Sequence, residues 1–412
     1  MTSSIDVAII GAGPYGLSLA AHLDHQKIDC RIFGKPMAPW IDNMPSGMLL
    51  KSYPWASSLS DPHSRFTVRQ YCIEQEMPYH DTLMALSIES FIAYGEAFRR
   101  RFVPNVEQKM VARLEKLAVG FRATFDDDET VTARHVILAV GVGPFKHIPD
   151  ILSGLPGEIL SHSGDYGPID TLRNKQVIVL GSGASASDLA ALLHEQGTAV
   201  SLLARGEVNF AAPPRRRSLF EELRSPTCGI GHGWVLRACS NAPWLVHMLP
   251  ESTRLRLAKV PRALGGAFMK ERVVSKVPVL SGRAVNAVAC SNGKVRIRTC
   301  LPDGTQQTLE ADHLVSATGY KIDVPRLGFL DPYLLWQIHC ADGTPVLSTK
   351  YESSVPGLYF IGPASAASFG PVSRFVFGAT YPAKLLARHL SARLGRRSTQ
   401  TTKSPEIVPA LQ

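Results

Sequence analysis

Two copies of one short pattern constrain this chain more than any other feature. The first, VAIIGAGPYGLSLAAHL, runs from Val7 to Leu23, and the second, VIVLGSGASASDLAALL, runs from Val177 to Leu193. Each copy joins an apolar run to a glycine cluster and then to a stretch rich in Ala and Leu. A strand buried in a parallel sheet reads as a continuous apolar run, so each copy predicts a strand, a tight turn and a helix.

The glycine spacing indicates dinucleotide binding. The first copy holds a complete G-x-G-x-x-G at Gly11, Gly13 and Gly16. These glycines allow a sharp turn, a close backbone approach to a pyrophosphate and close packing of the helix, whose N-terminus faces the phosphates. The second copy keeps Gly181 and Gly183 and places the small Ser187 at the third position.

Later apolar stretches indicate how the two units are arranged. They cover residues 134–144 and 312–320, and a last strand and helix are expected within 357–390. The simplest topology is a first domain interrupted by a second, which the chain enters near Gly143 and leaves near Tyr320. We therefore predict an α/β protein with two nested Rossmann-like domains, the first discontinuous (1–150 and 321–395) and the second continuous (151–320).

Two segments fall outside this pattern. Residues from about 210 to 278 are rich in Pro, Arg and Trp with short helical stretches, and they are too many for a strand connection, so we expect a helical insertion in the second domain. The tail 396–412 is rich in Ser, Thr and basic residues and is expected to be disordered.

Composition narrows the class of protein. A chain of 412 residues with a 45% hydrophobic fraction can fill more than one core. No apolar run reaches the ~20 residues of a membrane helix, and the first strand pattern begins at Ile5, so we expect a cytoplasmic protein without a signal peptide. The seven cysteines form no C-x-x-C pair, which argues against a metal site or a redox dithiol. The net charge of +9 is dispersed and favours anionic small molecules or an acidic partner over nucleic acid.

The pairing of two dinucleotide folds predicts an oxidoreductase. One such fold can bind NAD or FAD alone, whereas two nested folds can hold FAD in the first domain and deliver NAD(P)H from the second. A disulfide reductase shares this architecture but would need distant cysteines to converge beside the flavin. A flavin oxidase that releases hydrogen peroxide stays open as a further alternative.

Several segments carry a family resemblance. They are residues 11–17, 33–52, 59–67, 157–166, 317–320 and 368–379. In combination they resemble the flavin monooxygenases with two dinucleotide-binding domains, and most of all the lysine/ornithine N-hydroxylase-like branch, which includes FAD-dependent urate hydroxylases.

The resemblance implies the cofactor contacts. Toward FAD it assigns Gly11, Gly13, Pro14, Tyr15, Gly16, Trp40, Leu50, Lys51, Ser52, Gly362, Pro363, Phe369 and Gly370. Toward NAD(P)H it assigns Gly181, Gly183 and Ser185, with Thr318, Gly319 and Tyr320 in the crossover between the domains. The acid that usually binds the FAD ribose is missing near Gly34, so Lys35 or backbone groups are expected to replace it. Arg205 follows the second strand of the second domain and suits a 2′-phosphate, which favours NADPH and leaves NADH as the alternative.

The resemblance also implies the reaction. NAD(P)H reduces FAD, dioxygen forms a C4a-(hydro)peroxide, and one oxygen atom passes to a small organic substrate by hydroxylation at N or C or by Baeyer–Villiger insertion. The candidate catalytic groups are His162, Lys51, Arg65 and Arg374. The stretch before Asp61 departs from the N-hydroxylase pattern, which argues against ornithine or lysine. Urate, an amine and a secondary-metabolite intermediate stay open as substrates.

Partner predictions are fewer. The basic stretch Pro213–Arg217 is expected to contact a 2′-phosphate or an acidic partner such as a carrier domain, and a homo-oligomer stays open. Trp55, Trp234, Trp244 and Trp336 are candidates for lining a substrate cavity.

Overall fold

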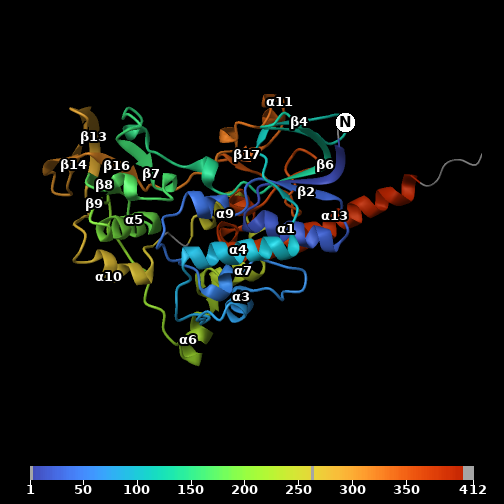
Figure 1. The fold of residues 1–412 in the computed structure, drawn as a ribbon, viewed down its shortest axis with the longest axis horizontal. Helices are drawn as coiled ribbons and strands as arrows, with labels where there is room; N and C mark the ends of the chain where they lie inside the picture. The colour runs from blue at the N-terminus through green and yellow to red at the C-terminus, as the bar shows by residue number, and fades with distance from the viewer. Residues whose placement is uncertain (1–2, 261–263, 402–412) are drawn as a thin grey trace, which may run out of the picture.

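The protein has two lobes, each built around its own sheet (Figure 1). The computed structural model describes residues 3–260 and 264–401. The first lobe contains the N-terminal strand and the C-terminal helix, whereas the second lobe is formed by the middle of the chain.

The sheet of the first lobe has the strand order β3-β2-β1-β6-β5-β4, and β19 lies beside β6. Its strands are β1 (Ser3–Ile10), β2 (Cys30–Phe33), β3 (Val106–Glu107), β4 (Val111–Lys116), β5 (Phe121–Phe125), β6 (Thr130–Leu138) and β19 (Leu358–Phe360). The long β6 pairs antiparallel with β5 through its first half and parallel with β19 through its second half. A strand from late in the chain thus completes the sheet that β1 begins.

Helix α1 (Pro14–His25) joins β1 to the rest of the first lobe. It begins with Pro14, which suits the first helical turn because no backbone donor is needed there. Residues 16–23 are buried, since α1 contacts β1, β2, α4 (Ile88–Phe102) and α13 (Thr380–Thr401). Because α13 extends to Thr401, the first part of the predicted disordered tail 396–412 is helical, and residues 402–412 lie outside the described residues.

The sheet of the second lobe is parallel throughout, with the strand order β12-β9-β8-β16-β7. Its strands are β7 (Leu160–His162), β8 (Gln176–Leu180), β9 (Ala199–Leu203), β12 (Val279–Leu280) and β16 (His313–Ser316). Helix α5 (Ala184–Glu195) follows β8 as α1 follows β1, and an antiparallel meander of β13 (Ala284–Ser291), β14 (Lys294–Cys300) and β15 (Gln306–Ala311) completes the lobe. The predicted α/β fold with two Rossmann-like sheets is confirmed. The division of the chain near residues 150 and 320 stays a prediction.

The middle of the helical insertion packs on the first lobe, although its sequence lies within the second domain, whereas its last helix packs on α5 of the second lobe. It contains α6 (Leu219–Arg224), β10 (Thr227–Cys228), β11 (Gly231–His232), α7 (Trp234–Asn241), α8 (Pro243–His247), α9 (Glu251–Leu257) and α10 (Lys270–Val273). Helices α8 and α9 contact α12 (Ala366–Phe369). Gly370 permits this approach, because a Cβ there would lie 3.0 Å from Val246 of α8. Figure 1 shows α6 and α7 beneath the first lobe and away from β8.

We expect Gly16→Ala to destabilise the first lobe. A Cβ at Gly16 would lie far inside the contact distance of the Gly11 carbonyl oxygen, so the turn or the helix must shift. Overpacking of this kind costs about 1–3 kcal/mol, which thermal unfolding would report as a lower melting temperature. Gly154→Ala is the matched control, since nothing lies within 4 Å of its Cβ. Equal melting temperatures for the two variants would contradict this account.

Candidate functional site

A cavity of about 630 Å³ begins where β1 and α1 meet and continues along the first lobe. One end is formed by Gly11–Tyr15, and the cavity then passes Trp40 and the segment Leu49–Ser52. Pro363, Arg374 and Phe375 contribute from the C-terminal part of the chain. We call it the first cavity. Of the predicted FAD contacts, the following line it: Gly11, Gly13, Pro14, Tyr15, Lys35, Trp40, Leu50, Lys51, Ser52, Gly362 and Pro363.

The N-terminus of α1 opens into the first cavity. Gly13 caps the helix without any side-chain hydrogen bond, and nothing lies within 4 Å of a Cβ built on it. Gly11 has a φ of +113°, which favours glycine, and its own Cβ would collide with the Ala139 carbonyl oxygen. The unsatisfied backbone N–H groups of such a helix end bind phosphates. This cradle fits the pyrophosphate of a dinucleotide.

The charges around the first cavity also suit an anionic cofactor. Its lining contains the cations Lys35, Lys51, Lys109 and Arg374, and Asp188 is the one acid among the described lining residues. Lys35 is paired with Asp42 at 2.7 Å, so the lysine expected to replace the missing ribose acid is already engaged. Lys109, which the sequence did not single out, also lines the cavity. It lies between β3 and β4 and forms an ion pair with Asp127.

Tyr15 holds the C-terminal wall of the first cavity. Its hydroxyl lies 2.9 Å from the carbonyl oxygen of Ser373 and 2.8 Å from that of Phe375. Burial raises the pKa of Tyr15, so the phenol stays protonated and donates to this pair of acceptors. The first residues of α1 thereby fix the backbone on either side of Arg374.

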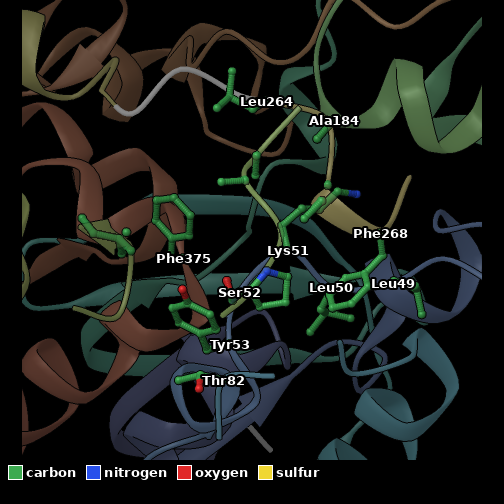
Figure 2. Close-up of a pocket in the computed structure, with 18 of the residues that line it drawn as sticks. Leu49, Leu50, Lys51, Ser52, Tyr53, Thr82, Ala184, Leu264, Phe268 and Phe375 are labelled. Atoms are coloured by element: carbon green, nitrogen blue, oxygen red, sulfur yellow. The ribbon is translucent and has the colours of Figure 1, made fainter. Parts of the chain in front are cut away.

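A second cavity of about 620 Å³ adjoins the first. The two share Leu49–Ser52, Arg374 and Phe375. The insertion supplies further walls through residues 229–232 and 264–269, and Ala184 contributes from the start of α5. Figure 2 shows Lys51, Ser52 and Tyr53 along one stretch of this wall, with Phe375 from the C-terminal part of the chain.

An ion pair connects the two lobes at the cavities. The Lys51 ammonium contacts the carboxylate of Asp188, which lies on α5 and is 2% exposed. Burial lowers the pKa of Lys51 to about 7. The sequence motif points to Lys51 but gives no signal for Asp188, because an acid inside an Ala- and Leu-rich helix resembles an ordinary surface position.

Arg374 bridges the first lobe and the insertion. Its Nη1 donates to the carbonyl oxygen of Ala258, just after α9, at 3.0 Å. Burial lowers its pKa, and no ion-pair partner occurs among the described residues. Arg374 therefore presents a cation without a countercharge to both cavities.

His162 lies outside both cavities. Its Nδ1 accepts from the backbone N–H of Gly164 at 3.0 Å, and its Nε2 lies 2.9 Å from the Gly319 carbonyl oxygen. Burial lowers the pKa of His162, which favours the neutral ring that this arrangement needs. His162 ties the end of β7 to the crossover, so its predicted catalytic role is replaced by a structural one.

Arg65 is also outside both cavities, and its side chain is exposed. The segment around it is organised by Asp61, which is 1% exposed. The Asp61 carboxylate accepts from the backbone N–H groups of His63, Arg65 and Phe66 at 3.0–3.1 Å. The motif therefore forms a turn and does not place Arg65 at a reacting centre.

Other predicted residues support the site without lining it. Gly16 packs α1 against the turn, Phe369 stacks on Tyr351 with ring centroids 3.7 Å apart, and Gly370 contacts α8. The crossover residues Thr318, Gly319 and Tyr320 lie between the lobes, where Tyr320 pairs with Lys146. Gly181 and Gly183 form the turn before α5, and Ser185 lines the first cavity.

The tryptophans and the basic stretch are also placed differently from their predictions. Trp234, Trp244 and Trp336 are 59%, 48% and 81% exposed, and Trp55 packs on Phe377, so none of them lines either cavity. Arg215 and Arg217 form ion pairs with Glu221 and Glu222 of α6, so internal carboxylates take the place of the expected 2′-phosphate.

This architecture is shared with known proteins. A family model described as pyridine nucleotide-disulphide oxidoreductase matches residues 5–371. The chain belongs to this family. It is 23% identical to the indole-3-pyruvate monooxygenase YUCCA1 of Oryza sativa subsp. japonica, over 77% of each chain. It is 27% identical to a ferredoxin--NADP reductase of Gluconobacter oxydans, over 93% of this chain and 87% of that protein.

The fold is shared with solved structures of the same class. An ornithine N-hydroxylase from Kutzneria sp. 744 matches with a TM-score of 0.74 at 16% identity, over 95% of this chain and 100% of that chain. These comparisons confirm the predicted resemblance to flavin monooxygenases and the oxidoreductase class. None of the seven cysteines lines either cavity, although the family description names a disulfide. Within the described ranges, no helix has the length and apolar character of a membrane span.

We expect Gly13→Ala to weaken FAD binding without destabilising the fold. The new methyl group meets nothing within 4 Å, but it projects where the cradle must approach a phosphate. Titration of the cofactor-free protein with FAD would show a Kd higher by about tenfold or more, because a lost hydrogen bond to a charged group costs about 1.5–3 kcal/mol. An unchanged Kd would move the pyrophosphate away from Gly13.

Proposed function

We propose that the protein is a FAD-dependent, NADPH-consuming monooxygenase that oxygenates a small, largely apolar organic anion. The observation that supports this most strongly is the second cavity, which adjoins the first through Leu49–Ser52 and is walled by the insertion. A reductase that only passes electrons to a protein has no use for such a chamber, whereas an oxygenase needs one to hold substrate beside the flavin.

The first cavity fits FAD by size and chemistry. Its glycine cradle accommodates the pyrophosphate, and the segment Leu49–Ser52 with Phe375 would lie along the ring system. When bound, FAD accepts hydride from NADPH and activates dioxygen. The chain's own residues orient the ring, exclude water with leucine and phenylalanine side chains, and hold cations at the boundary of the two cavities.

The lining of the second cavity favours an anionic substrate. Leucine, methionine, alanine and phenylalanine side chains form most of it, and no carboxylate occurs among the described lining residues. Lys51 already pairs with Asp188, which leaves Arg374 to bind an acidic group of the substrate. A protonated amine such as ornithine would lack a countercharge there. Urate matches the charge of this site, but its polar ring does not match the largely apolar lining.

We propose NADPH as the electron donor because the second lobe has a glycine turn for a dinucleotide and an arginine placed for a 2′-phosphate. The turn at Gly181 and Gly183 precedes α5, and Arg205 follows β9 with an exposed side chain that has no partner among the described residues. A guanidinium at this position suits a 2′-phosphate.

We propose that the protein associates with a second copy of itself and does not bind a carrier domain. Large apolar side chains of the insertion are exposed, among them Leu219 (85%), Phe220 (73%) and Met248 (73%). Where such exposed apolar side chains lie side by side, they mark protein–protein contacts. Two arginines of the stretch proposed for an acidic carrier are already neutralised by α6.

Oxygen incorporation tests the proposed reaction. The FAD-loaded protein is mixed with NADPH and ¹⁸O₂, once with indole-3-pyruvate, the acid named in several relatives, and once with L-ornithine. We expect labelled product and faster NADPH consumption with the organic acid only. Hydrogen peroxide equal to the NADPH consumed in both reactions would indicate an oxidase, and labelled hydroxyornithine would overturn the anionic substrate class.

Arg374→Gln tests the anion site. We expect the KM for an oxygenated organic acid to rise about tenfold or more, because a hydrogen bond to a charged group contributes about 1.5–3 kcal/mol. Arg69→Gln is the matched control, since Arg69 is exposed on α3 (Val68–Glu74) and lines neither cavity. Equal KM values for the two variants would show that Arg374 does not bind the substrate.

A further inference from the structure

A chain of hydrogen bonds runs from the insertion to the wall of the second cavity. The hydroxyl of Tyr53 lies 3.1 Å from Nε2 of His232, and Nδ1 of His232 lies 3.2 Å from Oγ1 of Thr227. Thr227 Oγ1 in turn donates to Oε1 of Glu222 at 2.6 Å. Tyr53 and His232 line the second cavity and do not line the first, so the chain ends at the substrate side.

The donors and acceptors fix the direction of this chain. Glu222 can only accept, because its pKa is lowered by the hydrogen bonds from Thr227 and by Arg217, whose Nε donates to it at 2.6 Å. The one hydrogen of the Thr227 hydroxyl is therefore committed to Glu222, and Oγ1 accepts from Nδ1–H of His232. That tautomer leaves Nε2 of His232 as an acceptor for the Tyr53 hydroxyl.

The insertion holds this chain of hydrogen bonds, which we call the relay, in place. Thr227 and His232 face each other across the β10–β11 hairpin, and the backbone N–H of Thr227 donates to the second oxygen of Glu222 at 2.8 Å. Arg217 also donates to the carbonyl oxygen of Ser225 at 2.6 Å. Helix α6, the hairpin and the basic stretch before them thus form one unit around the carboxylate.

We propose that Tyr53 and His232 act as a catalytic acid–base pair, with Thr227 and Glu222 as positioning residues. The inference rests on the proposed oxygenation and adds that the substrate loses a proton during it. The substrate proton passes to the Tyr53 oxygen as the Tyr53 hydroxyl proton passes to Nε2 of His232. The substrate becomes more negative by one charge, and His232 becomes an imidazolium that Thr227 and Glu222 stabilise.

The groups around Tyr53 and His232 keep both of these side chains uncharged before the reaction. The charged and titratable groups facing His232 and Tyr53 are Arg217, Glu222 and Cys228. Burial lowers the pKa of His232 and raises that of Tyr53, so the imidazole is free to accept and the phenol stays protonated near neutral pH. Because the relay needs neutral His232, product formation should fall as the pH drops through a histidine pKa that lies below the usual range.

The first test uses the FAD-loaded protein and nuclear magnetic resonance of ¹⁵N-labelled histidine. We expect His232 to show a protonated Nδ1 and an unprotonated Nε2, and its pKa to shift in Tyr53→Phe and in Glu222→Gln. Tyr333→Phe is the matched control, because Tyr333 is 67% exposed and remote from the relay. The opposite tautomer, or a pKa that does not respond to these variants, would overturn the proposal.

The second test measures oxygenated product per NADPH with indole-3-pyruvate as probe. We expect His232→Gln and Tyr53→Phe to lower this ratio by about 100-fold or more, and His232→Gln to lose the acid limb of the pH profile. Added imidazole should restore product formation in His232→Ala. Wild-type yield and an unchanged pH profile in His232→Gln would overturn the relay. If wild-type protein forms no product with the probe, the proposed substrate class fails, and the resonance measurement alone decides the relay.

Discussion

The contact between Lys51 and Asp188 is the ion pair that ties the two lobes together at the cavities. Asp188 lies in α5 of the second lobe and is almost completely buried, and a buried carboxylate is unfavourable unless a cation compensates it. That cation comes from the segment which lines both cavities in the first lobe. The pair therefore holds α5 against the segment that would lie along the flavin, with Lys51 lining both cavities and Asp188 lining the first.

The insertion adds walls to the nucleotide-binding architecture and so forms the second cavity beside the first. Its helices α8 and α9 pack on α12, and its hairpin supplies part of the wall of the second cavity. Arg374 joins these parts, since its backbone is held by Tyr15 and its guanidinium by Ala258. A displacement of the insertion would therefore change the charge and the shape of the chamber together.

The family shares a fold and differs in what surrounds the flavin. A disulfide reductase requires cysteines beside the ring, and no cysteine of this chain lines either cavity. An amine hydroxylase requires a countercharge for its substrate, and the described lining of the second cavity offers cations instead. The chemistry is thus set by a few side chains on a common scaffold, as in other widely used folds.

The sequence by itself determined the elements whose signals are local. The two apolar strands and glycine turns predicted both sheets, and Gly11, Gly13 and Tyr15 were expected at the first cavity, where the structure places them. These predictions succeed because a strand, a tight turn and a helix start each depend on residues that are neighbours in the chain.

Only the tertiary structure decided which distant side chains meet. It paired Lys51 with Asp188, brought Tyr53 to His232, and assigned His162 and Arg65 to structural contacts. It also folded α7, α8 and α9 of the insertion onto the lobe to which their sequence neighbours do not belong. No local pattern encodes such pairs, because they depend on how the lobes pack and on the need to compensate each buried charge and polar group.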